Sequence, residues 1–175
     1  MIIALAASMM LSTVAIGNAY ALTQIGDSAT IKTQNGKAQC IQDAISCGEG
    51  KLRAKLSLIT TNTEDGISTG NAQGVIQGSG WGWLVSEKGD TKNIELQNNG
   101  PLSFVYDSLN RELKMSGTFV DTDNNVYQYD ALGVIADTEK NHTSINLTIN
   151  LISPDGKTIQ IPVKGGVVLI PITTG

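Results

Sequence analysis

Apolar and polar residues alternate along most of the chain with a period of two, which is the pattern of half-buried β-strands. The alternation is cleanest at Ile145, Leu147, Ile149 and Leu151, which are separated by Ser, Asn and Thr residues. No stretch shows the 3.6-residue period of an amphipathic helix. The pattern predicts roughly eleven or twelve short strands joined by brief polar turns. We therefore expect one all-β antiparallel domain over residues 22–175, either a β-sandwich or a β-barrel.

One glycine-rich strand, expected from about Gln73 to Ser86, carries both tryptophans of the chain. Its period of two places three glycines on one face and the polar and aromatic residues on the other: Gly78, Gly80 and Gly82 against Ser79, Trp81 and Trp83. Bare backbone on a strand marks a close approach of another segment. We expect the tryptophan face to carry the core. The alternative is that Trp81 and Trp83 form a surface platform for a sugar or another small apolar ligand.

Turn signals divide the remaining strands. Asn35-Gly36 between two β-rich segments (28–34 and 37–42) predicts a tight hairpin. The polar stretch from Asn62 to Asn71 is expected to be a loop. Asn98 to Pro101 has the composition of a turn, and Ser153-Pro154-Asp155-Gly156 has the composition of a type I turn.

The first 21 residues differ from the rest of the chain. They are apolar and uncharged and end in Ala19-Tyr20-Ala21, the small-x-small pattern of a signal-peptide cleavage site. A standard signal peptide has a basic residue before its apolar run, but here no Lys or Arg precedes the run. A run of about 15 apolar residues is short for a membrane span, which needs about 20. We expect residues 1–21 to be a signal peptide and the protein to be secreted, extracellular or at the cell surface; the alternative is a retained apolar N-terminal helix.

Cys40 and Cys47 are the only cysteines, and an even number in an exported chain indicates a disulfide. In a continuous helix their Cα atoms would lie about 10.5 Å apart, beyond the reach of a disulfide. A Cys40–Cys47 bond therefore requires the segment between them to fold back. The spacing matches neither a zinc site nor a Cys-x-x-Cys redox motif.

The charge composition argues against a nucleic-acid-binding function. The formal net charge is −4 and charged residues make up 16% of the chain, against about 25% in typical soluble domains. Binding to nucleic acid requires a basic surface, so no nucleic-acid partner is expected. Contact with a membrane is expected only through residues 1–21, if they are retained.

The segment Asp121-x-Asp123-x-Asn125 resembles the start of a calcium-binding loop. The positions that would need Gly and Glu in such a loop hold Val126 and Leu132 instead. A simple hairpin loop is the preferred interpretation. Calcium at Asp121, Asp123 and Asn125 is the alternative, and no other cofactor is expected.

Two N-glycosylation sequons follow each other closely, at Asn141-His142-Thr143 and Asn146-Leu147-Thr148. Each asparagine is expected to face solvent, one in a loop and the other on the polar face of a strand. His142 is the sole histidine, and no Ser-His-Asp or Cys-His arrangement can be assembled around it. No catalytic residue is therefore assigned.

The segment Val167, Val168, Leu169, Ile170 and Ile172 is apolar on both strand faces. Such a segment is typical of a central strand buried on both sides. The alternative is a strand that one subunit donates to another.

The segments Ser116–Tyr127 and Pro154–Gly156 resemble parts of small secreted β-proteins of uncharacterised function from mesophilic archaea. This resemblance covers about the last third of the chain. It implies export and a β domain, and it implies no activity.

Three functions are consistent with these observations. The first is an exported, non-enzymatic structural or assembly protein of the cell surface, associating with itself by strand exchange or with other surface proteins. The second is a monomeric extracellular ligand-binding β module. The third is a hydrolase, for which two carboxylates among Glu87, Glu95 and Glu112 would have to meet.

Overall fold

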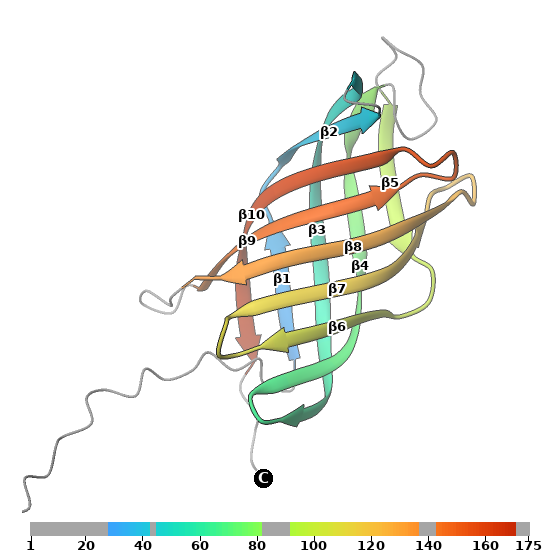
Figure 1. The fold of residues 1–175 in the computed structure, drawn as a ribbon. Helices are drawn as coiled ribbons and strands as arrows, with labels where there is room; N and C mark the ends of the chain where they lie inside the picture. Colours follow the sequence, from blue (N-terminus) through green and yellow to red (C-terminus); the bar gives the residue numbers. More distant parts are fainter. Residues whose placement is uncertain (1–27, 43–44, 82–91, 137–142, 171–175) are drawn as a thin grey trace, which may run out of the picture.

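The computed structural model describes residues 28–42, 45–81, 92–136 and 143–170. This part of the chain is all-β and antiparallel, as predicted, although with ten strands rather than eleven or twelve (Figure 1). Within these ranges no helix has the length and apolar character needed to span a membrane. The strands are β1 (Ser28–Thr33), β2 (Gly36–Gln42), β3 (Ile45–Glu64), β4 (Ile67–Trp81), β5 (Lys92–Asn98), β6 (Leu102–Asp107), β7 (Glu112–Val120), β8 (Val126–Ile135), β9 (Thr143–Ile152) and β10 (Thr158–Ile170).

The strands close into a ring. Strands β7, β8, β9 and β10 pair in sequence order, β10 pairs with β1 and β2, and both of these pair with β3. The ring is completed by β3–β4 and by the pairing of β4 with β5 and β6, which in turn pair with β7. Closure is thinnest between β5 and β7, which share two register pairs, Gln97 with Val120 and Asn98 with Phe119. The strands β6 to β10 form one layer that crosses steeply over the layer of β1, β3, β4 and β5 (Figure 1).

Ten strands fill eight positions of this ring because two positions each hold two strands end to end. Along β3, β1 pairs with residues 55–59 and β2 continues with residues 45–52. The prediction of a hairpin at Asn35-Gly36 is therefore wrong: β1 and β2 run in the same direction and do not pair. The predicted turn at Asn98 to Pro101 is likewise a break in one line, since β5 and β6 follow each other along β4.

At both breaks a side chain replaces a missing backbone hydrogen bond. The residue that ends the first strand uses its side chain to accept the backbone N–H that the break leaves unpaired on the neighbouring strand. Thr33 Oγ1 accepts Ala54 N–H at 2.7 Å, and Asn98 Oδ1 accepts Gly74 N–H at 2.9 Å. An unpaired buried amide is costly, so these two side chains allow the ring to continue past each interruption.

The longest hairpin of the fold joins β3 to β4 through a turn that the sequence analysis missed. Register pairs continue from Glu49–Trp81 to Glu64–Ile67, so the expected loop from Asn62 to Asn71 is wrong. The reversal occurs at Asp65-Gly66, where both residues have positive φ (48° and 81°). Asp-Gly is a preferred pair for such a two-residue turn. The polar residues on either side of it belong to β3 and β4 and not to a loop.

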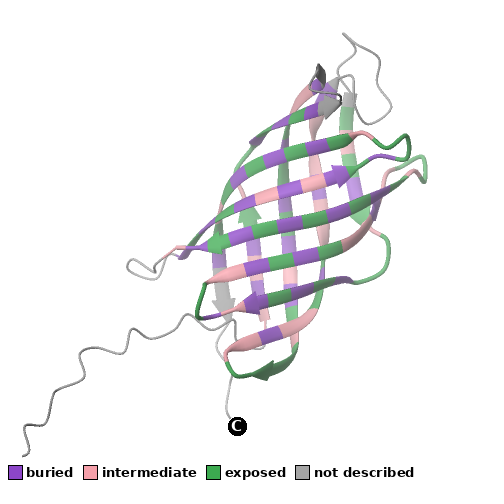
Figure 2. Ribbon diagram, viewed as in Figure 1, coloured by how far each residue is buried: buried purple, intermediate pink, exposed green. Residues whose placement is uncertain are grey.

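The core lies inside the ring, and buried and exposed residues alternate along its strands (Figure 2). β8 alternates at every residue. The largest fully buried side chains include Tyr106, Tyr127, Phe104 and Phe119, with aliphatic residues from the opposite layer around them. A ring of eight strand positions has an interior just wide enough for side chains to fill, and the buried hydrophobic residues form one core cluster there.

The glycine-rich strand β4 faces the core with its glycines, so the expectation that the opposite face carries the core is wrong for the described residues. Ile76, on the same face as Gly78, is fully buried, whereas Gln77 and Ser79 face outward. The predicted close approach is confirmed at Gly78, because a Cβ there would overlap the carbonyl oxygen of Lys51 on β3. The glycines let β3 and β4 bend tightly around the core.

Candidate functional site

A polar hollow of about 710 Å³ crosses the outer surface of β3, β4 and β5. It extends from Asn35, at the break before β2, to the β7–β8 loop at residues 121–123. We call this hollow the polar trough. The backbone of Gly78 contributes to its floor, between the outward side chains of Gln77 and Ser79.

Strand register explains why polar side chains gather here. Outward positions of β3, β4 and β5 stand side by side in two rows, Arg53–Gln77–Glu95 and Lys51–Ser79–Asn93. All six residues line the trough. Their inward neighbours, such as Leu52, Ile76 and Leu96, are fully or almost fully buried. The buried apolar face of each strand therefore fixes the polar row on its other face.

Hydrogen bonds connect the first row into a ladder. Arg53 donates from Nη2 to Gln77 Oε1 (3.3 Å), and Gln77 donates from Nε2 to Glu95 Oε2 (2.8 Å). Gln97 donates to the other oxygen of Glu95 (3.2 Å). The bonds from Gln77 and, secondarily, Gln97 hold the pKa of Glu95 below its ordinary value, so Glu95 is a carboxylate at neutral pH.

The loop at the far end of the trough is organised by one carboxylate. Asp121 Oδ1 accepts the backbone N–H groups of Asp123 (2.9 Å) and Asn125 (2.8 Å). Asp121 Oδ2 accepts the Asn125 side-chain amide (2.8 Å) and the Tyr127 hydroxyl (3.0 Å). Partial burial alone would raise the pKa of Asp121, but these hydrogen bonds outweigh it and lower the pKa.

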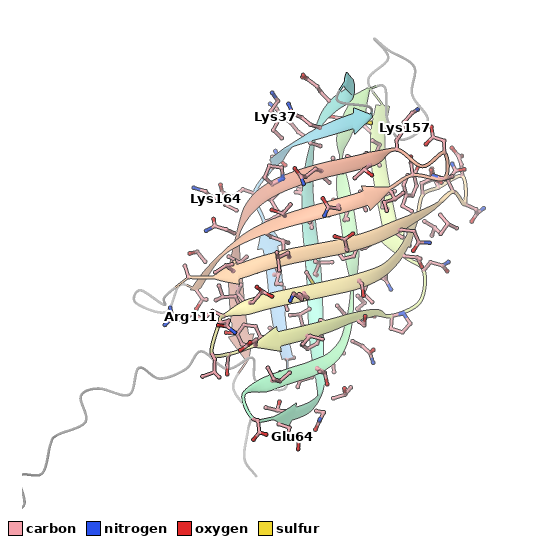
Figure 3. The ribbon with its side chains drawn as sticks, in the orientation of Figure 1. Lys37, Glu64, Arg111, Lys157 and Lys164 are labelled. Carbon is pink, nitrogen blue, oxygen red and sulfur yellow. The ribbon has the colours of Figure 1, made fainter. Side chains whose placement is uncertain are left out.

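A second hollow of about 590 Å³ continues the trough toward the end of β4. The two share Asn35, Lys51 and Ser79, and the second adds Lys37 and Glu49. Lys37 projects outward from β2 (Figure 3). Trp81 pairs in register with Glu49, so the tryptophan segment predicted to bind ligand begins where this hollow ends. The side chain of Trp81 and the whole of Trp83 lie outside the described residues.

The aspartate pattern of the predicted calcium loop has a structural role. The four hydrogen bonds to Asp121 use both of its oxygens and hold the loop in its turn. No group of three or more His, Cys, Asp or Glu side chains suited to a metal occurs among the residues described. Calcium binding at Asp121, Asp123 and Asn125 stays a prediction.

Carboxylates considered for glycoside hydrolysis are not brought together in the described structure. Glu95 lines the trough, whereas Glu112 begins β7 and pairs in register with Asp107 and Val134 at the opposite end of that strand. Glu87, His142 and the sequon asparagine Asn141 lie outside the described residues.

The chain folds back between Cys40 and Cys47, as a disulfide between them would require. The chain reverses between β2 and β3, with Gln42 opposite Ile45, and a bulge places Cys47 between Ser46 and Gly48 beside Cys40. Cys40 is fully buried and does not carry a free thiol. The side chain of Cys47 is not described, so its bond to Cys40 stays a prediction.

The apolar C-terminal segment is paired on both sides within the chain. Val167 pairs with Thr143 of β9 and with Ile31 of β1, and the pairing with β1 continues to Ile170. Ile172 lies outside the described residues. A strand held on both edges would have to leave the ring before another subunit could receive it.

Ligand binding by Trp81 and Trp83 stays a prediction, and the polar rows of the trough were not predicted from the sequence. Outward Lys, Gln, Asn and Glu residues on strands have the composition of an ordinary solvated face. Their common feature is that they occupy matching outward positions on three neighbouring strands, and this becomes visible only once the β3–β4 hairpin is in register.

Comparison with protein families, with curated proteins and with solved structures gives no match to this chain.

Proposed function

We propose that the protein is an exported, non-enzymatic module that binds a carbohydrate in the polar trough. The observation that carries this proposal is the trough itself, a hollow of about 710 Å³ floored by glycine backbone and bordered by two rows of polar side chains. Concave sites with convergent polar groups are the usual place for small-ligand binding. Export is supported by the apolar segment 1–21 and its Ala19-Tyr20-Ala21 end.

The chemistry of the rows suits a polyhydroxylated ligand. Sugar hydroxyls donate and accept hydrogen bonds, and the trough offers both kinds of partner: guanidinium and ammonium donors at Arg53 and Lys51, an acceptor at Glu95, and amides that do both at Gln77 and Asn93. The ladder holds Arg53, Gln77 and Glu95 in place before a ligand arrives, which reduces the entropy lost on binding.

The other two functions have less support. A glycosidase needs a carboxyl group with a raised pKa as its general acid, whereas hydrogen bonds lower the pKa values of Glu95 and Asp121 in the trough. Assembly by strand exchange would require β10 to break its pairing with both β1 and β9.

The test is a calorimetric titration of the full chain with neutral oligosaccharides derived from glucans, mannans and chitin. We expect at least one series to bind, and Gln77→Ala to weaken that binding about tenfold, because about 1.4 kcal/mol is lost with its hydrogen bonds. The matched control is Gln128→Ala, at an exposed outward position of β8 in the other layer, which should bind as the wild type does. Absence of binding in all three series, or equal weakening by both variants, would refute the proposal.

A further inference from the structure

The layer opposite the trough exposes apolar side chains on its outer surface. Leu132 and Val134, on β8, are 47% and 50% exposed. They border a hollow of about 390 Å³ that continues over β9 to Pro162 on β10. Exposed apolar groups gathered around one hollow indicate a surface that something else covers.

Asn146 stands in the middle of this surface. It is exposed on β9, pairs in register with Val134 on one side and Lys164 on the other, and lines the same hollow. Lys164 projects outward from β10 (Figure 3). Thr148, the third residue of the Asn146 sequon, pairs in register with Leu132 on β8 and with Pro162 on β10. A group attached to Asn146 would therefore lie beside Val134 and Lys164, with Leu132 and Pro162 at the next outward position of the neighbouring strands.

A second outward asparagine on the same strand shows the contrast. Asn150 donates to Asp130 (2.8 Å) and accepts from Gln160 (3.3 Å), so its amide is held in a cross-strand network. The Asn146 side chain makes no hydrogen bond within the described ranges. Asn146 also begins an Asn-x-Thr sequon, whereas Asn150 is followed by Leu151-Ile152 and does not.

We propose that Asn146 carries an N-linked glycan whose first sugar packs on Leu132, Val134 and Pro162. A pyranose ring has an apolar C–H face, which this hollow would receive while the hydroxyls remain in water. The inference rests on the proposed export of the chain and not on ligand binding in the trough.

The modification is a transfer from a lipid-linked oligosaccharide phosphate. Asn146 Nδ2 forms a bond to the anomeric carbon of the first sugar as the bond from that carbon to the phosphate oxygen breaks. The amide loses one proton, and the lipid phosphate leaves with the electron pair of the broken bond and takes up that proton. Because the side chain is exposed in the folded strand, the product fits the native structure without rearrangement of the sheet.

The first experiment expresses the full chain with an added secretory leader in eukaryotic cells, so that the site is tested independently of the chain's own N-terminal segment. Enzymatic release of the glycan in ¹⁸O-labelled water converts each glycosylated Asn to labelled Asp, which separates Asn146 from Asn141 by peptide mass spectrometry. We expect label at residue 146, its loss in Asn146→Gln, and its retention in Asn150→Gln. Secreted protein that is unlabelled at residue 146 would overturn the proposal.

The second experiment tests the packing. Binding of an apolar fluorescent dye should be stronger for Asn146→Gln than for the glycosylated protein, because the hollow is then uncovered. Adding Leu132→Ser and Val134→Thr to Asn146→Gln should remove that increase. Equal dye binding with and without the glycan would show that the sugar does not cover this surface. Oligosaccharide titration of the same samples reports on the trough separately, since it lies on the other layer.

Discussion

Two tyrosines on β8 provide a sharp test of the core, because their hydroxyls have opposite environments. Tyr127 and Tyr129 are both buried, at 0% and 3% exposure. The Tyr127 hydroxyl donates to Asp121 at 3.0 Å, whereas the Tyr129 hydroxyl has no partner among the described residues. Burial raises the pKa of both phenols, so both remain protonated throughout the physiological range.

Replacing each tyrosine by phenylalanine removes only the hydroxyl. Tyr127→Phe loses a hydrogen bond to a charged group and should lower the free energy of unfolding by about 1.5–3 kcal/mol. Tyr129→Phe removes an unsatisfied buried hydroxyl and should raise it by about 1–2 kcal/mol. The edge-to-face contact of Tyr129 with Phe119, at a centroid distance of 5.0 Å, is retained in the variant.

The assay is equilibrium urea unfolding of both variants and the wild type, analysed by linear extrapolation. The two variants should lie on opposite sides of the wild type, about 2.5–5 kcal/mol apart by the sum of the two estimates. A Tyr129→Phe variant that is less stable than the wild type would refute this account, because it would show that the hydroxyl makes a stabilising contact.

Three further predictions concern the strand approach, acid stability and the cysteines. Gly78→Ala should destabilise the fold by about 1–3 kcal/mol, because the new Cβ overlaps a backbone oxygen of β3; Gly166→Ala, where a Cβ meets open space, is the control, and equal thermal shifts would contradict the close approach. The folded state lowers the pKa of Asp121, so the contribution of its carboxylate to stability is present above the ordinary pKa of about 3.9 and is lost as the pH falls through the folded value. In urea unfolding, Asp121→Asn should therefore be less stable than the wild type at pH 7, and its free energy of unfolding should fall less steeply below about pH 4. An equally steep fall in the variant would count against this assignment. Reduction of the predicted Cys40–Cys47 bond should lower the free energy of unfolding by about 2.5 kcal/mol; a mass that shows two free thiols in the native protein would exclude the bond.

The fold class could be predicted from the sequence because one face of each strand is buried. Along β9, for example, alternation alone places Ile145, Leu147, Ile149 and Leu151 inside, and all four are buried. The turns were harder to predict. Asn35-Gly36 has a strong hairpin composition, yet the chain continues straight on because β3 and β10 pair with the segments on both sides of it. Asp65-Gly66 forms the β3–β4 hairpin turn. The strand ends on both sides of it are polar, so the sequence pattern indicated a loop there.

The candidate site was less accessible to sequence reasoning than the fold. The alternation on β3 and β4 correctly separates Leu52 from Arg53, but it does not say which polar residues of different strands are neighbours. Arg53, Gln77 and Glu95 are far apart in the sequence. They become neighbours only through the register of β3 with β4 and of β4 with β5, and register is a tertiary property.

The most direct test of the proposed trough is residue-specific NMR of the backbone amides during titration with the oligosaccharide series that binds best. We expect chemical-shift changes to concentrate at Lys51, Gln77, Ser79 and Asn93 and to leave the outward positions of β8 and β9 unchanged. Changes confined to β8 and β9, or spread evenly over the ring, would contradict the assignment of the trough as the binding site.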